Sequence, residues 1–183
     1  MRVWIRTPFS LEKNLGKAYN EEMEMCPDGD ACCFIDGDLN FLTPDFGHIL
    51  NEYANNNPQA ILTCWTNRIH QLSVGQLHPN MQSTVMSECM RFAMSIKEDR
   101  TVSEIKGPVS GFLMVIPKSI WLKCRFTEEK VHNQPGDSKI LGIDNHFTNS
   151  ARKIGIPVLR MNGLFCYHGY RLLNGISYKT HLL

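Results

Sequence analysis

Ala31-Cys32-Cys33-Phe34-Ile35-Asp36-Gly37-Asp38-Leu39-Asn40 is the stretch around which the fold of this chain can be predicted. Its first five residues are apolar without a break, and a short apolar run that follows a turn is typical of a buried β-strand. The run ends on two carboxylates that are separated only by Gly37. Two like charges this close disfavour each other, and a divalent cation between them would remove that cost. The stretch therefore predicts a strand that ends in a metal site.

The chemistry of the two carboxylates favours Mg²⁺ or Mn²⁺, because both ions prefer oxygen ligands. Gly37 would let the backbone turn tightly around the ion, and ligands of open α/β sheets bind at the carboxyl ends of strands. The same triplet is also an ordinary turn sequence that need bind nothing. A calcium loop is excluded because Phe41 and Gly47 occupy its sixth and twelfth positions, where Gly and Glu are required. The phosphatase motif Asp-x-Asp-Gly-Thr matches poorly, because Leu39 follows the second carboxylate.

The composition is that of an ordinary globular protein, with 43% hydrophobic and 20% charged residues in a chain of 183. This length is enough for one domain with a substantial core, so we expect a single domain over residues 1–183. The formal net charge of +1 predicts no broad electrostatic attraction to nucleic acid or to a membrane surface.

The cellular compartment is predicted from the apolar runs and the cysteines. No run approaches the roughly 20 apolar residues of a membrane span, and Arg2 and Arg6 interrupt the amino-terminal run, so we expect neither a transmembrane segment nor a signal peptide. The seven cysteines are an odd number without a Cys-x-x-Cys pair, which indicates neither a disulfide framework nor a zinc ribbon. We expect reduced core cysteines in a cytoplasmic protein.

The order of apolar runs and turn signals predicts an α/β fold. Strands are expected over residues 3–7, 31–35, 60–65, 156–161 and 164–168, and a further strand, 111–116, lies within 110–117. Helices are expected over residues 14–25, 43–54, 81–96, 118–123 and 144–154, and loops or exposed segments over 69–80, 97–106 and 127–138. Asn162-Gly163 is a strong turn signal, so we expect the last two strands to form a carboxyl-terminal β-hairpin. The first strand–helix–strand unit predicts a right-handed parallel crossover, and the whole predicts a mixed, mostly parallel central sheet flanked by helices.

Two further polar residues stand at the ends of predicted elements. Asp144 begins a helix, and His168 ends the last strand as Asp36 ends the central one. If the two strand ends lie on the same rim of the sheet, His168 would join Asp36 and Asp38 around one ion. A neutral imidazole suits Mn²⁺ as well as Mg²⁺. The competing interpretation is that His168 only forms a hydrogen bond near the carboxyl-terminal tail.

Four segments of the chain, taken in order, resemble a small GT-A glycosyltransferase close to glycosyltransferase family 2. They are Asn14-Leu15-Gly16-Lys17-Ala18-Tyr19-Asn20, Phe34-Ile35-Asp36-Gly37-Asp38, Ser110-Gly111-Phe112 with Lys118-Ser119, and Gly142-Ile143-Asp144-Asn145-His146-Phe147 with Arg152-Lys153-Ile154-Gly155. The second resembles the family's metal-binding strand end, and the third resembles the strand and turn that pass beneath the donor sugar. The fourth resembles the segment that carries the catalytic base. The segments, with His168 at a common position of a third metal ligand, span residues 14–168.

The resemblance implies a GT-A-like, Rossmann-related fold and a metal-dependent activity. A sugar would pass from a nucleotide-diphosphate sugar to an acceptor hydroxyl with inversion, and the acceptor could be a glycan, a lipid-linked sugar, a protein or a modified nucleotide. Asp144 would be the general base. The ligands of Mn²⁺ or Mg²⁺ would be Asp36, Asp38 and His168. The residues implied at the donor site are Thr7, Pro8, Lys17, Asn20, Arg68, Asp36 and Gly111.

Other functions stay open because only residues 3–7 offer a strand before the Asp-x-Asp strand, whereas the family usually has two. The first alternative is a nucleotidyltransferase of related fold, although residues 6–13 lack the Gly-rich loop expected of one. The second is a non-catalytic module that binds a nucleotide sugar or a glycan. The third is a glycosyltransferase whose nucleotide site is completed by a partner chain or by a homo-oligomer.

Overall fold

A computed structural model describes residues 1–69, 75–129 and 142–169 of the chain. The elements, in chain order, are β1 (Val3–Arg6), α1 (Leu15–Met25), β2 (Ala31–Ile35), β3 (Leu39–Phe41), α2 (Phe46–Asn56), β4 (Ile61–Thr66), α3 (Met86–Ile96), β5 (Val102–Glu104), β6 (Leu113–Pro117), α4 (Lys118–Trp121), α5 (Ile143–Lys153) and β7 (Val158–His168). Every predicted helix is present, and the largest change is at α3, which begins at Met86 rather than at residue 81. Residues 70–74 of the predicted loop over 69–80, and residues 130–138 of the predicted loop over 127–138, lie outside the described residues.

The described strands form one mixed sheet in the order β1-β2-β6-β4-β7-β3, with β5 paired to β7. β1 and β2 are parallel, as the strand–helix–strand unit predicts, and so are β4 and β7. Each of the other described pairings, β2–β6, β4–β6, β3–β7 and β5–β7, is antiparallel. The expectation of a mostly parallel sheet is therefore wrong for these strands. After β5 the chain runs past α5, where the Asn145 side chain accepts a hydrogen bond from the Val109 N–H. It thereby reaches the carboxyl end of β2, and β6 starts there and runs antiparallel to β2.

The predicted carboxyl-terminal hairpin is also wrong, because β7 is one continuous strand from Val158 to His168. Its pairing with β4 shifts register between Cys64 and Trp65, so the strand passes Asn162 and Gly163 without reversing. A Cβ at Gly163 would lie 2.0 Å from the Asp99 carbonyl oxygen. The glycine is therefore needed for the close approach of another backbone segment and not for a turn.

Two short strands, β3 and β5, were not predicted from the sequence. Both pair antiparallel with β7, and β5 lies within the segment 97–106 that was expected to be exposed. Three-residue strands leave too little alternation to detect, and their pairing depends on contacts far away in the sequence. β3 matters for the site, because it sets Leu39 opposite His168.

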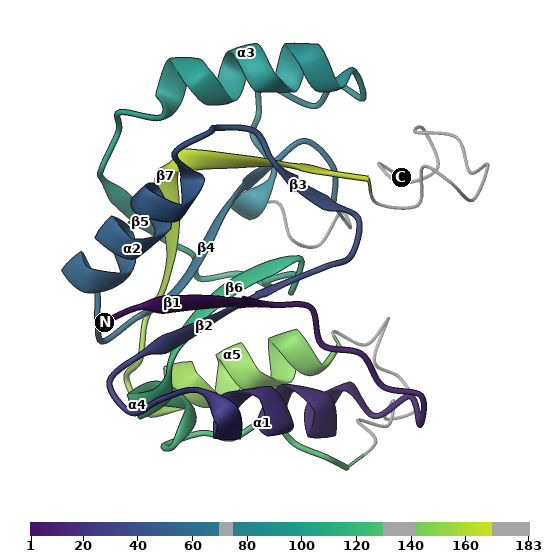
Figure 1. Cartoon of the computed structure of the whole chain (residues 1–183), viewed down its shortest axis with the longest axis vertical. Coiled ribbons are helices and arrows are strands. Elements are labelled where there is room, and N and C mark those ends of the chain that lie inside the picture. Colours follow the sequence, from purple (N-terminus) through teal and green to yellow (C-terminus); the bar gives the residue numbers. More distant parts are fainter. Residues whose placement is uncertain (70–74, 130–141, 170–183) are drawn as a thin grey trace.

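Helices cover both faces of the sheet (Figure 1). Successive side chains of β2 point to opposite faces of the sheet. Phe34 packs in a cluster with Tyr19 of α1 and Phe147 of α5, whereas Cys33 packs in a second cluster with Leu50 of α2. α3 lies over the end of the sheet formed by β3 and β7, where its buried residues join a third cluster. The strand ends between these layers carry the polar residues described next.

Candidate metal centre

The turn that follows β2 carries both carboxylates to the end of β7. The Asp36 N–H donates to the Phe112 carbonyl oxygen at 3.0 Å, and the Leu39 N–H donates to the Asp36 carbonyl oxygen at 3.2 Å. The chain then enters β3, whose first residue pairs with His168, and the Gly169 N–H donates to the Asp38 carbonyl oxygen at 3.0 Å. Gly37 is not among the glycines with positive φ, and a Cβ there would meet nothing within 4 Å. Backbone pairing, and not the glycine, therefore shapes this turn.

The structure brings Asp36, Asp38 and His168 together. The His168 Nε2 lies 3.4 Å from Asp36 Oδ2 and 3.3 Å from Asp38 Oδ1, and one potential ligand atom from each residue lies within 4.8 Å of the others. Neighbouring ligand atoms of an octahedral ion with bonds of about 2.1 Å are about 3 Å apart, so the three side chains are on the scale of one divalent cation. Of the His, Cys, Asp and Glu side chains in the described residues, these three form a group that could hold one metal ion.

The hydrogen bond to the other ring nitrogen fixes the orientation of His168. Its Nδ1 lies 3.0 Å from the Arg68 carbonyl oxygen, which can only accept, so Nδ1 carries a hydrogen. In the neutral imidazole, Nε2 then presents its lone pair to two carboxylate oxygens. That arrangement is repulsive unless a cation or a second proton lies between them. A histidine that donates from one nitrogen to a carbonyl while the other faces carboxylates has the geometry of a metal ligand.

The surroundings of the group leave one side closed and one side open. The His168 side chain is 2% exposed and its ring stacks on that of Phe112, with centroids 5.2 Å apart and planes at 23°. The side chains of Asp36 and Asp38 are 47% and 45% exposed. A cation bound here would therefore be held by protein on one side and could reach solvent or a substrate on the other.

Asp144 lies in the first turn of α5 and contacts the segment that leads into β6. Its Oδ2 accepts a hydrogen bond from the Gly111 N–H at 2.6 Å, and its Oδ1 accepts one from the Asn145 N–H at 2.9 Å. Burial raises the pKa of the Asp144 carboxyl, and these N–H donors oppose the rise. The residue after Gly111, Phe112, contacts both Asp36 and His168. Two neighbouring residues, Gly111 and Phe112, therefore link the Asp144 carboxyl to the three candidate metal ligands.

A side chain that sequence reasoning missed, Gln76, holds that same segment. Its Oε1 accepts from the Ser110 N–H at 2.7 Å, and its Nε2 donates to the Ser110 carbonyl oxygen at 3.0 Å and to Thr63 Oγ1 at 2.6 Å. Gln76 is fully buried. An isolated glutamine in a predicted loop gives no signal of this role, because the signal is the distant Ser110 backbone that it contacts.

The residues expected at the donor site fall in different surroundings. Thr7 and Pro8 follow β1, which is parallel to β2, so they lie at the edge where Asp36 lies. Gly111 contacts Asp144, and a Cβ there would lie 3.0 Å from the Asp144 Cβ. Arg68 is buried and supplies the carbonyl that holds His168. Lys17 is about half exposed and lies 3.4 Å from Glu12.

Asn20 is buried, and its amide is engaged by other parts of the protein. Its Oδ1 accepts from Trp121 Nε1 at 2.9 Å and from the Phe126 N–H at 3.2 Å, and its Nδ2 donates to the Phe126 carbonyl oxygen and to Glu128. Four residues earlier, a Cβ at Gly16 would lie 1.9 Å from the Thr127 carbonyl oxygen. The segment 14–20 thus packs α1 against the chain around residues 121–128, which gives Asn20 a structural role.

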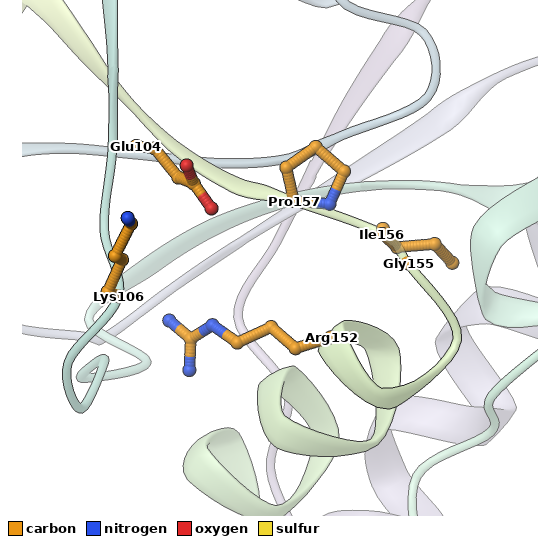
Figure 2. A pocket seen from close by; sticks show the side chains of 6 residues that line it. All are labelled: Glu104, Lys106, Arg152, Gly155, Ile156 and Pro157. Atoms are coloured by element: carbon orange, nitrogen blue, oxygen red, sulfur yellow. The ribbon is translucent and has the colours of Figure 1, made fainter.

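A separate cavity of about 260 Å³ lies at the other end of β7 (Figure 2). It is lined by Glu104, Lys106, Arg152, Gly155, Ile156 and Pro157. The guanidinium of Arg152 donates to the carbonyl oxygens of Ile105 and Gly107, and burial lowers its pKa. The cavity adjoins the amino end of β7, whereas His168 is the last residue of that strand. Arg152 therefore ties α5 to the chain after β5 and does not reach the metal group.

Comparison with protein-family models found no match, and comparison with curated proteins found no relative. None of the helices in the described part of the chain combines the length and the apolar character that crossing a bilayer requires. All seven cysteines fall within the described residues, and each is a free thiol.

Proposed function

We propose that this chain is a divalent-metal-dependent glycosyltransferase that moves a sugar from a nucleotide-diphosphate sugar to an acceptor hydroxyl. The observation that carries the proposal is the inward-facing Nε2 of His168, which lies 3.3–3.4 Å from two carboxylate oxygens while Nδ1 donates to a carbonyl. A cation bound between these three side chains, where the strands end and Asp36 and Asp38 are partly exposed, would satisfy this arrangement. Oxygen and imidazole ligands suit Mn²⁺ and Mg²⁺.

The choice of glycosyl transfer among metal-dependent reactions is supported by the resemblance to GT-A enzymes. Asp36 and Asp38 end β2, and residues 110–112 lead into the neighbouring β6. This is the placement that the resemblance implies for the strand beneath a donor sugar. The same three residues connect the metal group with Asp144, so the implied ligands and the implied base lie around one segment.

Each residue of the site has a chemical task in this proposal. An ion held by Asp36, Asp38 and His168 would act as a Lewis acid on the diphosphate leaving group. The buried Phe112 and the Arg68 carbonyl keep the His168 ring in place. Asp144 takes the proton of the acceptor hydroxyl, and burial, which raises its pKa, makes it a stronger base than a solvated aspartate.

The proposal is tested by measuring the release of nucleotide diphosphate. Purified protein is incubated with uridine, guanosine, cytidine and deoxythymidine diphosphate sugars in Mn²⁺, in Mg²⁺ and in EDTA. Each mixture also contains free sugars and glycans, whose hydroxyls can accept the transferred sugar. We expect release from at least one donor that requires the metal and is lost in Asp38→Ala. Donor binding without release would indicate a binding module. Pyrophosphate release from a nucleoside triphosphate and a sugar phosphate would indicate a nucleotidyltransferase.

A further inference from the structure

Asn67, which directly follows β4, is fully buried and holds the main chain of His168. Its Oδ1 accepts a hydrogen bond from the His168 N–H at 2.8 Å and one from Thr66 Oγ1 at 3.3 Å. Its Nδ2 donates to the Ser83 carbonyl oxygen at 2.9 Å. One side-chain amide thus joins the end of β7 to the end of β4 and to the chain that leads into α3.

The side chain of Asn67 replaces a backbone acceptor that the sheet does not supply. The β4–β7 ladder ends with the pair Thr66 and Cys166, and the Thr66 carbonyl accepts from the His78 N–H. The His168 N–H is buried beyond this last pair, and an unpaired buried N–H is costly. The next residue, Arg68, accepts from the His168 ring. Residues 67 and 68 therefore hold the main chain and the ring of the same histidine.

We propose that Asn67 is a positioning residue that sets the metal affinity of the centre through the main chain of His168. The inference rests on the metal site of the proposed function. The His168 Cα is fixed by the Asn67 bond, and the ring direction is then fixed by the Arg68 carbonyl and by Phe112. Partners that orient a metal-binding histidine typically change metal affinity by about 10–100-fold when they are removed.

Two substitutions separate positioning from general stability. Asn67→Ala removes the acceptor for the His168 N–H. Asn67→Asp keeps an acceptor there, but it replaces the donor to Ser83 by an oxygen and adds a buried carboxyl group. The matched control is Asn162→Ala. Asn162 lies in β7, six positions before His168, and its side chain donates to Thr101 and Ser103. If Asn67→Ala does not fold, Asn67→Ser is used in its place. The serine hydroxyl oxygen is one bond closer to the main chain than the asparagine Oδ1, so it cannot reach the His168 N–H.

The experiment measures Mn²⁺ affinity by titration calorimetry and the melting temperature of each metal-free variant. We expect Mn²⁺ to bind about 10–100-fold more weakly to Asn67→Ala, or to Asn67→Ser in its place, and at least as tightly to Asn67→Asp as to the wild type. Asn162→Ala should lower the melting temperature without changing the affinity. Hydrogen exchange adds a second readout, because the His168 amide should lose protection in Asn67→Ala and keep it in Asn67→Asp.

The two proposals fail in different ways. Equal Mn²⁺ affinity of the wild type and the alanine or serine variant would overturn the role of Asn67 and leave the metal site intact. Affinity that falls in proportion to melting temperature in all variants, Asn162→Ala included, would overturn it too. A wild type that binds no Mn²⁺ would overturn the metal site itself and, with it, this inference.

Discussion

Replacing Gly163 by alanine should strongly destabilise the protein, because β7 passes another backbone segment at this residue. The new Cβ would lie 2.0 Å from the Asp99 carbonyl oxygen and 3.1 Å from that of Ile96, while the Gly163 N–H donates to the Tyr53 hydroxyl at 2.9 Å. Real Cβ contacts are essentially never shorter than 3.0 Å, so one of the two backbones must move by about 1 Å.

The size of the effect follows from that displacement. Overpacking of a well-packed region costs about 1–3 kcal/mol, and a contact with rigid backbone on both sides belongs at the upper end, about 3 kcal/mol. For a chain of this size 1 kcal/mol shifts the melting temperature by about 2–4 °C, so the expected loss is about 6–12 °C. Thermal unfolding followed by circular dichroism measures it directly.

Two glycines provide controls for this measurement. A Cβ at Gly37 or at Gly47 would meet nothing within 4 Å, so alanine at either should change the melting temperature by only a degree or two. A Gly163→Ala protein that melts within about 2 °C of the wild type would refute the close approach of β7 to Asp99, and with it the continuous strand that carries His168 to the two carboxylates.

Three further predictions concern the site and its supports. Asp144→Asn should lower turnover by about 100-fold or more while donor affinity stays nearly constant in titrations, since a general base typically contributes this factor; an equal loss of affinity would indicate a donor-binding role. Burial raises the pKa of Asp144 in the folded state, so at mildly acid pH the folded protein binds more protons than the unfolded one. The stability of the wild type should therefore fall as pH rises through the folded pKa, and Asp144→Asn should lack this decrease. Melting temperatures of the two proteins that change in parallel from about pH 4 to 7 would contradict this. Gly16→Ala should destabilise by about 1–3 kcal/mol in denaturant unfolding because its Cβ would overlap the Thr127 carbonyl, and an unchanged midpoint would count against that packing.

The sequence predicts the elements whose signals are local. The five apolar residues of β2, the helical stripe of α1 and the Gly155 stop after α5 are all found, and Gly155 has the positive φ of 81° that favours glycine. Asn162-Gly163 was misinterpreted because the same dipeptide that favours a turn also allows backbone segments to approach. Only the contact with Asp99 separates the two readings, and that contact is not local.

The proximity of Asp36, Asp38 and His168 could be predicted from the sequence, whereas the residues that support them could not. Carboxylates and a histidine at strand ends are visible in a sequence, because they interrupt apolar runs. Asn67 and Gln76 are single buried amides whose roles come from the backbones of His168 and Ser110, many residues away. The direction of β6 likewise depends on how α5 guides the preceding chain, so a parallel sheet was the natural but incorrect expectation.

The central claim is that Asp36, Asp38 and His168 bind one divalent cation, and a Mn²⁺ titration of four proteins tests it most directly. Calorimetry is run on the wild type, Asp38→Ala, His168→Ala and the exposed control Glu98→Ala, with circular dichroism to confirm that each is folded. We predict one Mn²⁺ per chain for the wild type and the control, and an affinity at least about 10-fold weaker for both site variants. Equal Mn²⁺ affinity in all four folded proteins would contradict the metal centre.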